Sequence, residues 1–245
     1  MNVKITISYD GFSYQGSQRQ PNKKSVENKL IEVFTLLNIE PKITLSGRTD
    51  KQVHATGQVF NINIPLFWSD SEKLKKVLNH KLPTSIRVKN IKKVSDEFHS
   101  RFHAKKRVYR YVISTKEITP FLANYVTFVK SINEEKIKEA ISLFKGIHDF
   151  EYFHKLGSDK ENLIREIYDA RFYKYKDFYI FKFEANSYLR SQIRLMVGFL
   201  LKISDDKLSK DDLKKQLEKK KITNKIPAPA NGLYLAKVKY FFNKY

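Results

Sequence analysis

The order of the periodic segments is the feature that most constrains what this chain can fold into. Segments whose apolar residues alternate with polar ones, as in strands, are separated by segments whose apolar residues have helical spacing. Twice along the chain the order is strand, helix, strand, strand, helix, strand, with one extra helix before the last strand. The expected strands cover residues 3–9, 42–45, 60–64, 86–94, 108–114, 167–175, 178–185 and 233–242, and the expected helices begin near Ser25, Ser71, Asn133, Leu189 and Ser209.

This order predicts an α+β fold made of two ferredoxin-like (β-α-β-β-α-β) halves. The N-terminal half is expected at residues 1–104 and the C-terminal half at residues 105–245. Two such halves can join into one extended mixed or antiparallel sheet with flanking helices, which hides two strand edges and leaves a central cleft. Because no linker rich in Pro, Gly or Ser separates the halves, we do not expect them to move freely.

The balance of charge points to a polyanionic partner. The 245 residues include 47 Lys and Arg against 26 Asp and Glu, which gives a net charge of +21. A surplus of this size is typical of proteins that bind nucleic acid, a membrane surface or an acidic protein. A general bias in composition is the alternative, because most of the basic residues are Lys. The few Arg are more informative, since a guanidinium suits bidentate contacts with phosphate better than an ammonium does.

Several classes of protein are excluded by composition. The chain has no Cys, so disulfide frameworks, thiolate metal sites and cysteine nucleophiles are ruled out. The longest apolar run, residues 195–201, is far shorter than the roughly 18–20 residues that a membrane-spanning helix needs. The N-terminus alternates like a strand and has no signal-peptide core. We therefore expect a cytoplasmic protein with no membrane partner.

The connection between the second and third expected strands holds the most unusual cluster of side chains. It contains Arg48, Thr49, Asp50 and His54 in about a dozen residues, whereas such connections usually need two to five. A long loop that carries an Arg, an Asp and a His is typical of a functional site. The residues alone leave a second interpretation open, in which this is a turn with a solvated Arg and an Asp that caps the backbone.

This connection resembles the signature of the TruA family of tRNA pseudouridine synthases, which is G-R-T-D-A-G-V-H-A followed by G-Q-V. The matching residues are 47–50, 53–55 and 57–59. Six more blocks resemble the family in the same order along the chain, and together they are far more specific than one motif. They lie at residues 9–21, 98–104, 107–111, 146–150, 194–198 and 227–233.

The resemblance implies an isomerase that converts uridine to pseudouridine at positions 38 to 40 of the tRNA anticodon stem-loop, without cofactor or metal. It implies that the protein acts as a homodimer whose two subunits hold one tRNA. The catalytic residues that it implies are Asp50, Arg194 and Tyr109, and the substrate-binding residues are Tyr109, Arg48, Thr49, His54, Gln58 and Arg107.

The reaction explains the type of each catalytic residue. The glycosidic bond must break, the uracil must rotate, and carbon 5 must bond to the sugar. An ionised carboxylate such as Asp50 can act as the nucleophile, on the base or on the sugar, or can stabilise a sugar cation. A carboxylate in a site that excludes water needs a cation to stay ionised, which is the role implied for Arg194. Tyr109 is expected to stack on the target base, and Arg48 to help extrude the nucleotide from its stem.

Four positions depart from the family pattern. Lys51 and Gln52 stand where the family has Ala-Gly, and Gly there suggests a positive backbone angle that Gln tolerates poorly. Ser100 replaces an Ala, and Gln192 replaces a Met. The change at residues 51 and 52 motivates an alternative, a non-catalytic tRNA-binding protein that retains the fold. A nucleoside hydrolase that uses Asp50 is a second alternative.

His99 and His103 are four residues apart and invite a metal-site interpretation. They lie in an extended segment with no acidic cluster beside them, so no metal site is expected there. His148 and His154 are interpreted as turn or packing residues.

Overall fold

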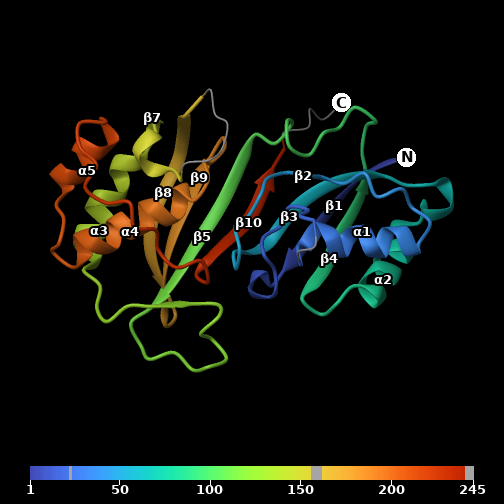
Figure 1. Ribbon diagram of the computed structural model, residues 1–245, viewed down its shortest axis with the longest axis horizontal. Coiled ribbons are helices and arrows are strands. Elements are labelled where there is room, and N and C mark those ends of the chain that lie inside the picture. Colours follow the sequence, from blue (N-terminus) through green and yellow to red (C-terminus); the bar gives the residue numbers. More distant parts are fainter. Residues whose placement is uncertain (22–23, 156–161, 241–245) are drawn as a thin grey trace. The chain divides into compact units, whose positions relative to one another are not determined.

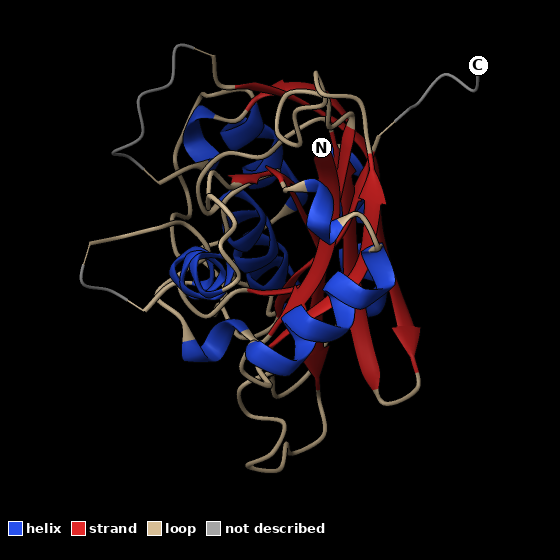
Figure 2. Cartoon of the chain, turned by 90° about the vertical axis from the view of Figure 1, so that its right-hand side faces the viewer, coloured by secondary structure: helices blue, strands red, loops and turns tan. Residues whose placement is uncertain are grey.

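The computed structural model describes residues 1–21, 24–155 and 162–240. The chain forms two compact units, each described by itself. Unit 1 comprises Met1–Lys105 together with the C-terminal segment from Tyr234, and unit 2 comprises Lys106–Leu233. Figure 2 shows that helices and strands are both abundant, which confirms the α+β class.

Unit 1 has the predicted ferredoxin-like order of elements. Strands β1, β3 and β4 form an antiparallel sheet in the order β4-β1-β3, and the short β2 pairs antiparallel with the far edge of β3 (Figure 1). The elements are β1 (Asn2–Tyr9), α1 (Val26–Leu36), β2 (Thr44–Leu45), β3 (His54–Asn63), α2 (Ser71–Lys81) and β4 (Ile86–Lys93), with 3-10 turns at Gly11–Ser13 and Leu66–Trp68.

The apolar pattern builds the core of unit 1 as expected. The alternating residues Val3, Ile5 and Ile7 of β1 are fully buried. Helix α1 begins where the Ser25 hydroxyl accepts a hydrogen bond from the Asn28 amide, which satisfies one of the unpaired donors of the first turn. Its buried stripe ends at Phe34, whose ring meets the edge of Phe60 on β3 at 6.0 Å.

Strand β3 begins six residues earlier than the apolar alternation predicts. It starts at His54, so the connection from β2 spans residues 46–53, and Gly57 lies inside the strand. The alternation of apolar and polar residues is interrupted at Gly57, which has no side chain. The structure leaves no space for a side chain at this position. A Cβ at Gly57 would lie 2.4 Å from the carbonyl oxygen of Ala236. The loop that carries Asp50 is therefore shorter than expected, and His54 belongs to the sheet.

The last strand, β10 (Leu233–Lys239), pairs parallel with the start of β3. Tyr234 lies opposite His54, and Leu235 lies opposite Ala55. Most of β10 therefore groups with unit 1, although it follows unit 2 in the chain. The boundaries of the two predicted halves stay a prediction.

Unit 2 is an antiparallel sheet in the order β5-β9-β8-β7, with β6 parallel to β5 (Figure 1). Strand β7 is too short to give a periodic signal and was not predicted. The elements are β5 (Lys106–Ser114), β6 (Thr127–Phe128), α3 (Glu134–Ile141), β7 (Gly146–Asp149), β8 (Ile164–Tyr175), β9 (Phe178–Ala185), α4 (Gln192–Ser204) and α5 (Lys210–Leu217), with 3-10 turns at Ser142–Phe144 and Glu151–Phe153.

Helix α4 is the centre of the core of unit 2. Nine of its residues are buried, so it is apolar around most of its circumference, as a helix covered on several sides must be. Phe199 on α4 contacts Phe153, and Phe153 in turn meets the edge of Phe144. Phe144 also packs against Phe183 of β9, which ties the helices to the sheet.

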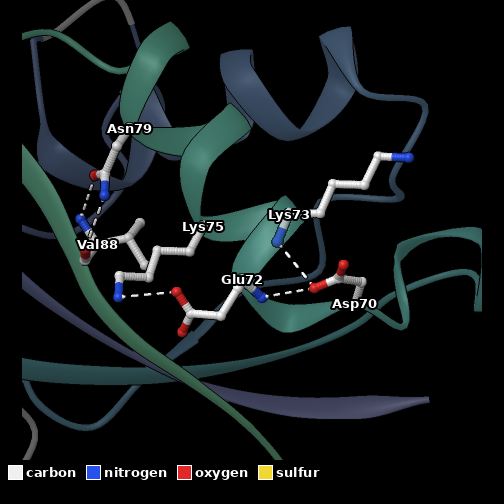
Figure 3. Close-up of polar contacts among 6 residues, drawn as sticks. All are labelled: Asp70, Glu72, Lys73, Lys75, Asn79 and Val88. Atoms are coloured by element: carbon white, nitrogen blue, oxygen red, sulfur yellow. Dashed lines mark hydrogen bonds and ion pairs between the residues drawn. The ribbon is translucent and has the colours of Figure 1, made fainter.

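Helix α2 is fixed to the edge strand β4 by one side-chain amide (Figure 3). Asn79 accepts a hydrogen bond from the Val88 amide at 2.7 Å and donates one to the Val88 carbonyl at 2.9 Å. The helix begins at Asp70, whose carboxylate accepts from the amides of Glu72 and Lys73 at 3.0 Å. Asn79 thus takes the place of a neighbouring strand along an edge that would otherwise be open.

We expect Asn79→Ala to lower the free energy of unfolding by about 1–3 kcal/mol, because it leaves the amide and carbonyl of Val88 without their partner. The control is Lys75→Ala, which removes an exposed pair with Glu72 at 3.4 Å and is expected to cost under about 0.5 kcal/mol. Urea denaturation of both variants measures the difference. Equal losses would show that Asn79 adds nothing beyond an ordinary surface contact.

Candidate active site

The loop at residues 46–53 holds Asp50 and is anchored at its start by Gln58 of β3. The Ser46 hydroxyl donates to Gln58 Oε1 at 2.6 Å, and Gln58 Nε2 donates to the Gly47 carbonyl at 2.9 Å. The Ser46 amide also donates to the Val59 carbonyl at 2.8 Å. Gln58 is fully buried, so these bonds form away from solvent and hold the loop where it leaves β2.

The residue before Asp50 is held at both its backbone and its side chain. The Thr49 amide donates to Ser17 Oγ at 2.8 Å, and the Ser17 amide donates to the Thr49 carbonyl at 3.1 Å. The Thr49 hydroxyl lies 2.8 Å from the Tyr9 hydroxyl. Burial raises the pKa of Tyr9 to about 12, so its phenol is neutral at physiological pH, and one of the two hydroxyls donates a hydrogen bond to the other.

Gly16 lets the chain pass directly over the backbone of the Asp50 loop. Its φ of +114° is in the region that favours glycine, and a Cβ there would lie 2.9 Å from the Thr49 carbonyl oxygen. The same Cβ would lie 3.6 Å from the carbonyl carbon of Asp50 and from the amide nitrogen of Lys51. The backbone on both sides of Asp50 therefore rests against a position that tolerates no side chain.

Asp50 opens a tight turn that Gln52 completes in a left-handed conformation. The Val53 amide donates to the Asp50 carbonyl at 3.2 Å, and Gln52 has a φ of +65°. This is the positive angle expected from the Gly that the family pattern places there. Gln52 adopts it at a cost of about 1–2 kcal/mol relative to a right-handed backbone. The departure at Lys51 and Gln52 thus leaves the turn in the conformation that Gly would favour.

His54 supports the loop region from β3. Its side chain is buried, with Nδ1 3.0 Å from the Gly11 amide, which donates to it, and 3.2 Å from Asp10 Oδ1. Its ring stacks on Tyr234 of β10 with centroids 4.8 Å apart. The contacts described for Thr49, His54 and Gln58 are with the protein itself. They position the loop, and the substrate contacts expected of these residues remain predictions. Arg48, by contrast, is exposed.

In unit 2, strand β5 carries Arg107, Tyr109 and Tyr111 on one face, because residues two apart in a strand point the same way. Arg107 Nη1 donates to the Asn186 carbonyl at 2.7 Å, and the Tyr109 ring meets the edge of Tyr188 at 5.2 Å. Tyr111 is fully buried, so it is a packing residue.

Arg194 lies in the first turn of α4 and forms two hydrogen bonds with the backbone of Ala228. Arg194 Nε donates to the Ala228 carbonyl at 2.7 Å, and the Ala228 amide donates to the Arg194 carbonyl at 2.8 Å. The segment stays close to the helix because Gly198 has no side chain: a Cβ there would lie 2.3 Å from the Ile226 carbonyl oxygen. Burial raises the pKa of Tyr111, and the positive charge of Arg194 partly opposes this shift.

Sequence reasoning missed most of the supporting residues. Ser17 and Gly16 lie inside the recognised block at residues 9–21, but nothing in their types shows that they touch Thr49. Gln192, noted only as the loss of a Met, is fully buried and accepts a hydrogen bond from the Leu189 amide at 2.8 Å. It thereby satisfies a backbone donor just before α4, a role that a Met could not fill.

The histidine pair at 99 and 103 makes turn contacts. His99 Nδ1 accepts from the amides of Arg101 and Phe102 at 3.2 Å, and His103 Nδ1 accepts from the His99 amide at 3.3 Å. Within residues 1–21, 24–155 and 162–240, no three His, Asp or Glu side chains gather as a metal site would require. None of the described helices combines the length and the apolarity needed to span a bilayer.

The chain matches a sequence profile of the family described as tRNA pseudouridine synthase, over residues 5–103 and 140–241. The matched residues include Asp50 and Arg194, whereas Arg107 and Tyr109 lie between the two matched stretches.

Similar relatives cover almost the whole chain. The tRNA pseudouridine synthase A of Campylobacter jejuni (strain RM1221) is 42% identical over 240 residues, which are 98% of this chain and 100% of that protein. The Wolinella succinogenes protein of the same name is 40% identical and covers 96% of this chain and 92% of its own length. The Phytoplasma mali protein is 37% identical, with 98% of each chain covered.

Among solved structures, a chain of a Cbf5-Nop10-Gar1 complex has 14% identity and a TM-score of 0.38. The match covers 81% of this chain and 45% of that chain. A similarity this low has no bearing on the fold or the site.

Gln52→Gly is expected to raise the free energy of unfolding by about 1 kcal/mol. Gly removes the strain of the left-handed backbone, and this gain exceeds the extra conformational entropy that a Gly loses on folding. Lys51→Gly, one residue earlier in the same turn with a negative φ, is expected to lower it by about 0.5–1 kcal/mol. Thermal and urea unfolding of the pair provide the test. Equal destabilisation by both variants would contradict a strained turn.

Proposed function

The chain belongs to the tRNA pseudouridine synthase family, and from that premise we propose that it isomerises uridine to pseudouridine at positions 38 to 40 of the tRNA anticodon stem-loop. The resemblance to the TruA family is confirmed, and the chain is an isomerase, as predicted. The positions on tRNA and the role of each residue are proposals. The observation that carries them is the way in which backbone contacts fix the loop at Asp50.

We propose that Asp50 is the nucleophile. In the reaction the bond between N1 of uracil and C1′ of ribose breaks, a bond between C5 and C1′ forms, C5 loses its proton and N1 gains one. Atoms and electrons balance within the nucleoside and water, so no oxidant or reductant is needed. A carboxylate can serve by forming a transient ester with the sugar or by adding to the base.

The geometry of the loop supports this role. A nucleophile must be held to within about 0.5 Å of its productive position, which requires supports that do not themselves move. Thr49, the residue before Asp50, is held by two hydrogen bonds between its main chain and Ser17. Gly16 lies close to the backbone of residues 49–51. The turn that follows is closed by Val53. These supports act on the backbone and leave the chemistry to the side chain.

We propose that Arg194 is the cation that keeps Asp50 ionised during the reaction. A carboxylate shielded from water would otherwise take up a proton and cease to be a nucleophile. Ala228 fixes one edge of the Arg194 guanidinium through Nε, so the side chain is already ordered before substrate binds. Pre-ordering lowers the entropic cost of forming an ion pair.

The other site residues are proposed to bind the nucleotide. Tyr109, held edge-on by Tyr188, is expected to stack on the target base. Arg48 is exposed on the loop beside Asp50 and is expected to occupy the space that the extruded uridine leaves. Arg107 is expected to contact the substrate, as are Thr49, His54 and Gln58.

The alternative of a non-catalytic tRNA-binding protein was motivated by Lys51 and Gln52. Because Gln52 adopts the left-handed angle, the turn after Asp50 has the form that a Gly would give it, and the geometric reason for the alternative is removed. We further propose that the protein works as a homodimer in the cytoplasm, with tRNA as its partner and without a cofactor. Sedimentation with and without tRNA tests the dimer. Turnover that is retained after treatment with a metal chelator tests the expectation that no metal cofactor is needed.

Asp50→Asn is expected to lower turnover by at least about 10³-fold while tRNA binding changes by less than about 3-fold, because the amide cannot act as a nucleophile. Tritium release from tRNA labelled at carbon 5 of uridine measures turnover. The control is Asp96→Asn, an exposed carboxylate in the same unit, which should retain wild-type turnover. Wild-type protein that binds tRNA without turnover would support the non-catalytic alternative, and release of free uracil would indicate a hydrolase.

Arg194→Gln is expected to reduce turnover by at least about 100-fold at neutral pH and to move the acid limb of the pH–rate profile to higher pH. The sign follows because an adjacent cation lowers a carboxylate pKa, so its loss raises the pKa and extends the protonated, inactive range upward. Arg190→Gln, four residues earlier and exposed, is the control. An unshifted acid limb would contradict the pairing of Arg194 with Asp50.

A further inference from the structure

Two arginines lie on the same face at one end of the sheet in unit 2. Arg107 on β5 pairs with Ala185 on β9, and Ala185 pairs with Ile167 on β8, strands that lie side by side in Figure 1. Arg165 is two residues before Ile167 and therefore points to the same face of the sheet. No motif in the sequence includes Arg165.

Asn186 connects the ends of the three strands on which these arginines lie. Its carbonyl accepts from Arg107 Nη1 at 2.7 Å, and its amide donates to the Glu166 carbonyl at 3.1 Å. Its side-chain Oδ1 accepts from the Glu166 amide at 3.3 Å and from the Ser187 amide at 2.6 Å. Asn186 therefore holds the Arg107 guanidinium and the backbone of Glu166, the residue that follows Arg165.

Arg165 has an unsatisfied donor and a like-charged neighbour. Its Nη1 donates to the Asn162 and Ile164 carbonyls, but its Nε is buried and has no hydrogen-bond partner. Burial, and to a smaller extent the positive charge of Arg107, lower the pKa of Arg165. In the described part of the chain no carboxylate forms an ion pair with Arg165. A part-buried pair of like charges with an unused donor is unfavourable unless an anion binds there.

The hydroxyl of Tyr188 is a second buried donor without a partner, and it also lies near Arg107. Its oxygen is buried and makes no hydrogen bond. Burial raises its pKa well above the ordinary value, so the phenol is neutral and can donate, and Arg107 opposes this shift. The nearby carboxylate of Glu184 is paired with Lys106 at 3.5 Å. Two unused donors therefore border the same guanidinium.

We propose that Arg165, Arg107 and the Tyr188 hydroxyl bind a backbone phosphate of the tRNA next to the target uridine. A phosphodiester oxygen accepts hydrogen bonds from guanidinium and hydroxyl groups, and its negative charge offsets the repulsion between the arginines. The phosphate is next to the target because Tyr188 contacts Tyr109, which we expect to stack on the target base. The inference rests on the proposed function, whose tRNA substrate supplies the phosphate.

A double-mutant cycle between protein and RNA tests this site. The substrates are tRNAs in which a single phosphodiester, on the 5′ or the 3′ side of the target uridine, is replaced by an uncharged methylphosphonate. We expect Arg165→Gln to raise KM on normal tRNA about 10-fold and to flatten the salt dependence of binding by about one unit of log–log slope. One of the two neutral linkages should raise KM about 10-fold for the wild type and not further for Arg165→Gln.

Two further variants separate phosphate binding from a structural role. Tyr188→Phe removes only the unpartnered hydroxyl, so its thermal stability should equal or exceed that of the wild type while KM rises about 3–10-fold. Arg171→Gln, an exposed arginine on β8 paired with Asp169 at 2.7 Å, is the control and should keep the wild-type response to both neutral linkages. If Arg165→Gln fails to fold, the same cycle is run with Arg165→Lys.

The outcomes distinguish a failure of the proposed function from a failure of the phosphate site. No pseudouridine from wild-type protein on unmodified tRNA would overturn the proposed function itself. Normal wild-type turnover with independent effects of Arg165→Gln and both neutral linkages would overturn only the phosphate site. A loss of stability in Tyr188→Phe without a change in KM would show that its hydroxyl is structural.

Discussion

The position of Asp50 depends on a contact between two stretches of backbone, with Gly16 on one side and residues 49–51 on the other. No side chain fits between them, and the hydrogen bonds between Ser17 and Thr49 hold the two stretches in register. Backbone contacts of this kind are stiffer than contacts between long side chains, because few rotatable bonds separate the atoms that touch. The backbone that carries the Asp50 carboxylate is therefore held in one position.

The rest of unit 1 holds this contact in place. Tyr9 at the end of β1 reaches Thr49, and Gln58 of β3 holds the start of the loop. Both strands are central in the antiparallel sheet, where register cannot slip without moving the buried residues Ile5 and Phe60 to the wrong face. In unit 2 a backbone contact also fixes a candidate site residue. Arg194 donates to a backbone carbonyl on a segment that passes close to Gly198. In both units glycines permit the close approach.

Much of the fold could be predicted from the sequence, because its strands and helices have apolar residues at regular spacing. The early start of β3 could not, since Gly57 interrupts the pattern for a reason that lies 179 residues away at Ala236. Strand β7 has four residues, too few for a period. The candidate site residues Asp50 and Arg194 were identified through family motifs, but Arg165 was not. The role proposed for Arg165 depends on a buried Nε and a neighbouring charge, and neither can be read from residue types.

The most direct test of the central claim is a map of pseudouridine, nucleotide by nucleotide, in an unmodified tRNA incubated with the purified protein. Our account predicts pseudouridine at uridines 38 to 40 and at no other position. Pseudouridine elsewhere in the tRNA, or free uracil in place of pseudouridine, would contradict it.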